Sequence, residues 1–136
     1  MLPESFKDKR VTIMGLGLFG GGVAVAEYLA SQKAQIVITD LRSAAQLADS
    51  IQQLHDRNID ATWFLGSHPD DAFDNSEIIV VNPAVRPGNK YVERCRSQEK
   101  LITSEIEIFV ENNPALTVAV TAVSYTHLTL PTIYSV

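Results

Sequence analysis

The stretch VTIMGLGLFG, residues 11–20, and the mostly apolar run GGVAVAEYLA that follows it, residues 21–30, decide the fold. The first four residues have the pattern of a short buried strand, and the run carries apolar side chains at helical spacing. Three glycines lie between the two patterns, at Gly15, Gly17 and Gly20, in the order G-x-G-x-x-G. The stretch therefore predicts a strand, a tight glycine turn and a helix.

The glycine turn suits a ligand that carries phosphate. In such a turn the first glycine permits the reversal, the second lets the backbone approach a ligand, and the third lets the helix pack close to the strand. The start of the helix then offers backbone N–H groups and the positive end of its dipole to a phosphate or pyrophosphate. Glycine turns of this shape also serve packing alone, and the motif by itself leaves that alternative open.

Composition narrows the function classes. The chain has 136 residues, 46% of them hydrophobic, which suits one α/β domain. Its net charge of −5 argues against a nucleic-acid partner. The single cysteine, Cys95, excludes an internal disulfide and fits a reducing compartment. The sequence has no apolar run of about 18 residues and no signal-peptide core near its start, so we expect a soluble cytoplasmic protein without a membrane partner.

An acidic residue follows the second predicted strand. Residues 35–39, QIVIT, are rich in β-branched side chains, and Asp40 comes directly after them. An acid about 20 residues beyond a glycine turn can accept hydrogen bonds from ribose hydroxyls. Arg42 is either a phosphate contact or a solvated side chain. The alternative for Asp40 is a turn or a helix N-cap, because a helix is also predicted to begin near Ser43.

Strand and helix patterns alternate along the rest of the chain. The expected helices cover residues 44–54, 91–98 and 104–111, and the expected strands cover residues 60–65, 77–81, 101–103 and 116–121. Such alternation with short connections predicts an α/β fold, a Rossmann-like open parallel sheet of about five strands with helices on both faces. The carboxyl ends of its strands then bring three loops to one crevice, at residues 15–20, 40–42 and 82–88.

Several polar residues are given structural interpretations. His55 has no partners at metal-ligand spacing, and the acid-rich residues 69–75 are predicted to be a solvated turn or a short helix, so no metal site is expected. His68 is predicted to lie on the ligand side of the sheet, but a lone loop histidine is weak evidence for a ligand contact. Ser104 with Glu107 matches a helix capping box. Glu105 and Glu107 are accordingly interpreted as cap and dipole partners rather than an acid/base pair.

Taken together, these motifs resemble one known family. The runs MGLGLFG (14–20), TDLR (39–42), VVNPAVRPGNKY (80–91), ITSEIEIF (102–109) and VAVT (118–121) are similar to the amino-terminal domain of the Mur ligases, ATP-dependent ligases of cell-wall peptidoglycan precursors. The resemblance covers residues 6–121. It is closest to the branch that adds D-glutamate to UDP-N-acetylmuramoyl-L-alanine, and in that family this domain holds the UDP end of the substrate.

The resemblance implies a set of UDP-binding residues. The backbone of the glycine turn would hold the diphosphate, with Leu18 and Phe19 lining it and the uracil. Residues 40–42 would face the uridine, and the loop at residues 82–84 would close on it. Phe19 stands where many family members carry a small hydroxyl residue, and Ala84 where many carry glycine. The implied contacts are Gly15, Gly17, Leu18, Phe19, Gly20, Asp40, Leu41, Arg42, Asn82, Pro83 and Ala84.

The resemblance also implies that the catalytic parts are missing. Complete Mur ligases use ATP and magnesium to activate the substrate carboxylate, in a central domain that opens with a strand and a G-T-N-G-K-[ST] loop. Residues 116–121 match that strand, but the sequence from Ala122 does not match the loop. We therefore expect residues 1–115 to be a UDP-sugar-binding domain in a catalytically inactive, monomeric fragment that binds no cofactor or metal itself.

The last residues are interpreted as artefactual. The run VSYTHLTLPT, residues 123–132, resembles the translation of a transposon-end sequencing adaptor, so residues 122–136 are expected to form a non-native, disordered tail. The alternative is a genuine divergent carboxyl terminus. Two other functions remain open on the motifs alone. One is an NAD-dependent oxidoreductase domain, which the glycine turn and Asp40 also fit, and the other is a stand-alone nucleotide-binding module.

Overall fold

The computed structural model describes residues 5–17 and 21–112. The predicted contacts at residues 18–20, the predicted strand at 116–121 and the tail at 122–136 lie outside these residues. The chain divides into two compact units after Glu105. The sheet and its first four helices belong to the first unit, and all but the first residue of the last helix belongs to the second.

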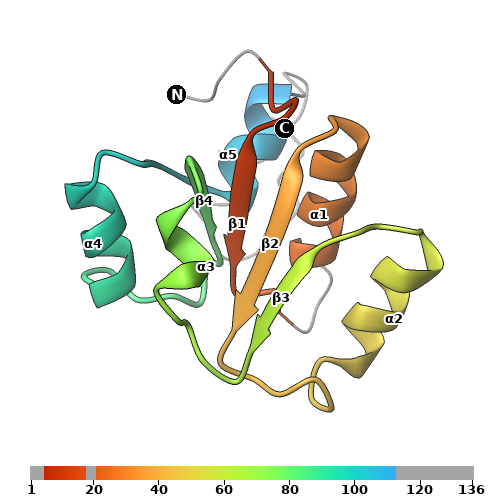
Figure 1. Ribbon diagram of the computed structural model, residues 1–136. Coiled ribbons are helices and arrows are strands. Elements are labelled where there is room, and N and C mark those ends of the chain that lie inside the picture. Colours follow the sequence, from red (N-terminus) through yellow and green to blue (C-terminus); the bar gives the residue numbers. More distant parts are fainter. Residues whose placement is uncertain (1–4, 18–20, 113–136) are drawn as a thin grey trace, which may run out of the picture. The chain divides into compact units, whose positions relative to one another are not determined.

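Within the described residues, the first unit is built on a five-stranded sheet (Figure 1). Its strands are β1 (Arg10–Met14), β2 (Gln35–Asp40), β3 (Thr62–Leu65), β4 (Ile78–Val81) and β5 (Leu101–Ser104). They are all parallel and lie in the order β3-β2-β1-β4-β5. The chain first runs outward from β1 to β3, then crosses back to β4 on the other side of β1. The direction therefore reverses between β1 and β4, where ligands bind in open parallel sheets.

Helices cover both faces of this sheet. They are α1 (Gly21–Ser31), α2 (Ala48–Asp56), α3 (Asp71–Asp74) and α4 (Lys90–Ser97), and α5 (Glu105–Asn112) follows β5. In Figure 1, α1 and α2 lie on one side of the sheet and α3 and α4 on the other. This arrangement confirms the predicted Rossmann-like α/β class, because right-handed crossovers place the helices of the two halves on opposite faces.

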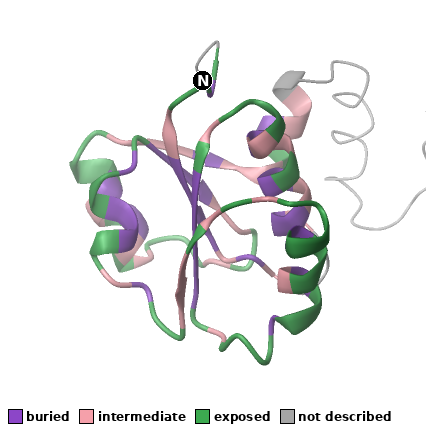
Figure 2. Ribbon diagram, turned by 45° about the vertical axis from the view of Figure 1, so that its right-hand side comes forward, coloured by how far each residue is buried: buried purple, intermediate pink, exposed green. Residues whose placement is uncertain are grey.

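The core lies between the sheet and these helices. Along each strand alternate side chains face opposite layers, so both layers need apolar residues. On the face of α3 and α4, Met14, Val37 and Ile79 pack in one cluster with Phe73 and Cys95. Figure 2 shows buried residues along the central strands and exposed residues on the outer sides of the helices. The lone cysteine is thus a buried packing residue.

The element bounds agree with the sequence predictions to within two residues, except at the start of α2. The helix expected from residue 44 begins at Ala48, because Ser43 and Gln46 first form a reciprocal pair: the Ser43 amide donates to Gln46 Oε1 at 2.9 Å, and the Gln46 amide donates to Ser43 Oγ at 3.3 Å. The acid-rich segment forms the short helix α3, one of its two predicted forms, with Arg94 of α4 paired with Asp74 at 2.8 Å. The buried side chain of Phe73 makes this helix part of the core.

No helix in the described part of the chain is long and apolar enough to cross a membrane. Within the same ranges, no group of three or more His, Cys, Asp or Glu side chains could hold a metal ion.

Candidate functional site

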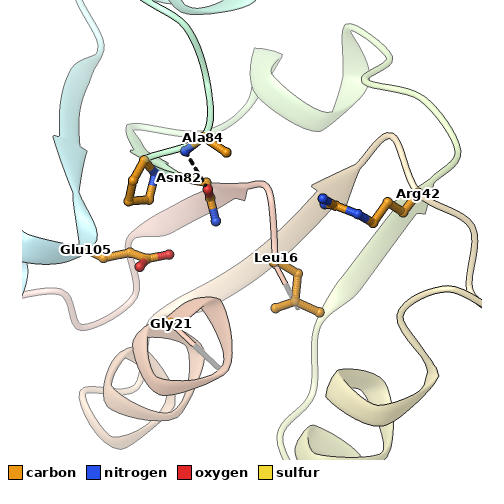
Figure 3. A pocket seen from close by; sticks show the side chains of 8 residues that line it. Leu16, Gly21, Arg42, Asn82, Ala84 and Glu105 are labelled. Atoms are coloured by element: carbon orange, nitrogen blue, oxygen red, sulfur yellow. Dashed lines mark hydrogen bonds between the residues drawn. The ribbon is translucent and has the colours of Figure 1, made fainter. Parts of the chain in front are cut away.

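An open cleft of about 420 Å³ lies at the carboxyl ends of the strands, beside the reversal point between β1 and β4 (Figure 3). It is lined by Leu16, Gly17, Gly21, Arg42, Asn82, Pro83, Ala84 and Glu105. The three loops predicted to meet at one crevice all contribute to it. Leu41 and Asp40, which were predicted to face a ligand, do not line it.

The glycine turn needs its glycines for conformation and for space. Gly15 and Gly17 have φ angles of 92° and 80°, in the left-handed region that favours glycine. A Cβ on Gly15 would lie 2.8 Å from Asn82 Cβ, and one on Gly17 would lie 3.1 Å from Asn82 Nδ2. The turn can therefore pack against the loop after β4 only with glycine at these positions.

Side chains from three other elements hold the backbone of this turn. Asp40 Oδ2 accepts the Leu16 amide at 2.9 Å, at the end of β2. Ser50 Oγ of α2 donates to the Gly17 carbonyl at 3.2 Å, and Asn82 Nδ2 donates to the Gly15 carbonyl at 3.2 Å. Residues 15–17 of the turn are thus held in place by the protein itself, which lowers the ordering cost of binding.

Asp40 has both carboxylate oxygens engaged by the protein itself. Its side chain is buried, Oδ2 accepts from the Leu16 amide, and Oδ1 accepts the Arg42 amide at 2.8 Å. The second contact forms an Asx turn, which is the turn alternative weighed from the sequence. The visible role of Asp40 is to position the glycine turn and the start of the next loop, and its predicted contact with a ribose stays a prediction.

The loop after β2 brings one positive charge to the cleft. The side chain of Arg42 lines the cleft, is 42% exposed, and lies 3.5 Å from Asp40 Oδ1 through Nη1. Leu41 beside it is 65% exposed, which is unusual for a large apolar residue. A partly exposed guanidinium at the mouth of a cleft suits a phosphate or a polar base.

The loop after β4 is stiffened by Asn82. Its side chain accepts the Ala84 amide at 2.8 Å through Oδ1 while Nδ2 reaches the glycine turn. Pro83 and Ala84 then form one wall of the cleft (Figure 3). The predicted rigid loop is confirmed in position, and Asn82 links it to the turn on the opposite side.

Gly22 is the residue of α1 that packs closely against the turn. A Cβ there would lie 2.8 Å from Leu16 Cα and even closer to the Leu16 carbonyl oxygen. From the sequence this role was assigned to Gly20, which lies outside the described residues. Because Gly21 and Gly22 extend the glycine run, the motif alone does not reveal which glycine meets the turn.

Glu105 was interpreted from the sequence as a cap and dipole partner of a helix, and the structure also places its side chain at the cleft. It begins α5, as expected, and its Oε2 atom is buried with no hydrogen-bond partner in the part of the chain that the structure describes. Burial raises the pKa of the Glu105 carboxyl. A signal was present in the sequence: Glu105 lies two residues after the strand predicted at 101–103, at the same sheet edge as Asp40.

His68 lies near this edge but belongs to the core of α3 and α4. Its Nδ1 is 2.7 Å from Thr39 Oγ1, and its ring packs edge-on against Phe73 and Tyr91. Burial lowers the pKa of His68, and the charge of Asp40 partly opposes that shift. It does not line the cleft, in keeping with its interpretation as a weak ligand candidate.

The chain matches the family of MurD-like N-terminal domains of Mur ligases over residues 9–104. It is 42% identical over 121 residues to a UDP-N-acetylmuramoylalanine–D-glutamate ligase of Borreliella burgdorferi, covering 89% of this chain and 26% of that protein. It is 40% identical over 113 residues to the protein of the same name from a Roseiflexus species, covering 83% of this chain and 24% of that one. The chain thus spans about a quarter of these relatives.

A solved structure shares the fold at lower identity. The UDP-N-acetylmuramate–alanine ligase MurC from Thermotoga maritima matches with a TM-score of 0.59 and 19% identity, over 76% of this chain and 22% of that one. This likeness supports the fold, while the match over residues 9–104 supplies the family. The chain belongs to the Mur ligase family, as a MurD-like amino-terminal domain.

Proposed function

We propose that this chain is the substrate-holding part of a ligase that adds D-glutamate to UDP-N-acetylmuramoyl-L-alanine, and that its cleft binds the UDP end of that substrate. The observation that carries the proposal is the cleft itself. It joins a rigid glycine turn, the start of α1 and one arginine at the reversal point of the sheet. Family membership supplies the substrate class.

Different residues of the cleft are proposed to contact different parts of the ligand. The start of α1, at Gly21, offers backbone N–H groups and the positive end of the helix dipole to the diphosphate. Arg42 lies where it can contact a phosphate or the uridine, with the exposed Leu41 available to cover the base. The loop at residues 82–84 closes the other side. Leu18, Phe19, Gly20 and Asp40 remain proposed contacts.

Catalysis belongs to other parts of the complete ligase. When ATP and magnesium are bound, they supply an activated acyl phosphate of the substrate carboxylate. We assign both groups to the central domain of the complete ligase, because the sequence from Ala122 does not match the phosphate-binding loop of the family. We propose that residues 1–115 form the substrate domain and that residues 116–121 begin the central domain. The 136-residue chain should bind as a monomer and release no phosphate from ATP.

Titration calorimetry on the 136-residue chain tests this function. UDP-N-acetylmuramoyl-L-alanine and UDP should bind measurably, and NAD should not, because the cleft is proposed to recognise a uridine diphosphate rather than a dinucleotide. Tighter binding of NAD than of UDP would overturn the proposal in favour of an oxidoreductase domain.

A further inference from the structure

One carboxyl oxygen of Glu105 has no partner among the described residues, at the place proposed for the diphosphate. This oxygen, Oε2, is buried, and the carboxyl packs against Gly21, the first residue of α1. Figure 3 shows the side chain pointing between Gly21 and Asn82 into the cleft. A buried polar atom without a partner is costly, which indicates a site completed by something that binds there.

The charges around Glu105 do not neutralise it. Among the described residues that line the cleft, the one other charged side chain is that of Arg42, which already lies beside Asp40. On α1 the first titratable residue is Glu27, which pairs with Arg57 at 2.9 Å. The lining loop at residues 82–84 carries no charge. On α5 the next acid is Glu107, and it is exposed.

A diphosphate at the start of α1 would therefore meet a carboxyl group at close range. If that group were ionised, negative charges would face each other in a partly buried cleft, which disfavours binding. If it carried a proton, its O–H would donate a hydrogen bond to a phosphoryl oxygen, and such bonds to charged acceptors are strong. Burial already raises the pKa of the Glu105 carboxyl in the empty cleft.

We propose that Glu105 takes up one proton from solvent when the ligand binds and, as the neutral acid, donates a hydrogen bond to a phosphoryl oxygen of the nucleoside diphosphate. The inference rests on the proposed function, because it needs a diphosphate at the start of α1. It makes Glu105 a ligand contact that couples affinity to pH.

Calorimetry in two buffers of different ionisation enthalpy, Pipes and Tris, measures the proton directly. The probe is UDP-N-acetylmuramoyl-L-alanine, in which each phosphate carries one ester and one anhydride bond, so both stay singly ionised between pH 5.5 and 8.5. Above the pKa of free Glu105, the wild-type chain should take up as much as one proton per ligand, and its affinity should fall by as much as tenfold per pH unit. Glu105→Gln should take up none and keep a flat affinity.

Glu107→Gln is the matched control, since it removes the same charge from the same helix at an exposed position outside the cleft lining. It should behave like the wild type. Proton uptake that persists in Glu105→Gln, or no uptake by the wild-type chain, overturns the inference while leaving UDP binding intact. If no nucleotide binds at all, the proposed function itself fails and this inference with it.

A second measurement needs no variant. The ¹³C shift of the Glu105 carboxyl, followed by NMR at fixed pH, should move to the protonated value when the ligand is added. A shift that stays at the ionised value in the saturated complex contradicts the proposal even if Glu105→Gln does not fold.

Discussion

Asp40 shows how one side chain can serve a site without lining it. It is buried at the end of β2, and its two oxygens accept the backbone amides of Leu16 and Arg42. Both amides belong to loops that form the cleft, so removing the carboxylate would leave two donors unpaired and two loops less fixed. At the scale of the residue, positioning and binding are therefore expected to change together.

Asp40→Ala should weaken UDP binding by about 1–3 kcal/mol and lower the free energy of unfolding by a similar amount. The first effect is measured by calorimetry and the second by urea denaturation. Ser50→Ala removes a hydrogen bond to the same turn from a different element and should give a smaller loss of both. If Asp40→Ala bound UDP with unchanged affinity, the role of Asp40 would be limited to its local turn.

Gly22→Ala should destabilise the fold more than the neighbouring substitution Gly21→Ala. Its new Cβ would meet the backbone of Leu16, whereas the Cβ of Gly21→Ala would meet only the flexible carboxyl end of Glu105. Both variants gain the same helix propensity, so their difference isolates the clash. The free energy of unfolding, measured by thermal or urea denaturation, should be about 1–3 kcal/mol lower for Gly22→Ala than for Gly21→Ala. Equal stability would mean that α1 does not pack on the turn as described.

At the scale of the elements, the layer of α3 and α4 contains a buried histidine that responds to pH. His68 contacts Thr39 of β2, Phe73 of α3 and Tyr91 of α4. Burial disfavours its charged form and lowers its pKa in the folded state. The unfolded chain therefore binds more protons than the folded chain just below the ordinary histidine pKa, so folding opposes protonation there.

The stability contributed by neutral His68 should be fully present above the unfolded-state pKa of about 6.5 and lost as pH falls toward the lower folded-state pKa. Urea denaturation between pH 5 and 8 measures this as a free energy of unfolding that rises with pH. The raised pKa of Glu105 makes the free energy of unfolding fall as pH rises, which opposes the effect of His68. The contribution of His68 is therefore isolated by comparing variants. His68→Gln should lose the rise, and the control His55→Gln, at an exposed helix end, should keep it. A rise retained in His68→Gln contradicts the assignment.

The sequence patterns predicted the elements better than the contacts between them. β-branched runs located all the described strands to within two residues, because burial in a parallel sheet demands such residues on both faces. The buried side of α3 was less visible, since Ala72 and Phe73 stand among four acids and amides that dominate the segment. Glu105 was assigned to a helix end because its local pattern is that of a cap. Only tertiary packing against Gly21 shows that it also faces the cleft.

At the scale of the whole molecule, the five strands of the described part of the chain lie within residues 10–104 and pair with one another. We propose that residues 122–136 are an artefactual tail that adds nothing to the stability of this sheet. Deleting them should leave the melting temperature unchanged or higher, as measured by calorimetry of the shortened and full chains. A large fall in melting temperature would mean that the tail packs on the fold and is native.

The central claim is that the cleft formed by the glycine turn, Arg42 and the loop after β4 holds a uridine diphosphate. Amide NMR spectra of the 136-residue chain, recorded while UDP is added, test it most directly. The account predicts that the largest shift changes fall on residues 15–17, on Gly21 and Arg42, and on residues 82–84 except the proline, and that NAD produces no such changes. Changes confined to other elements, or equal changes with NAD, would contradict it.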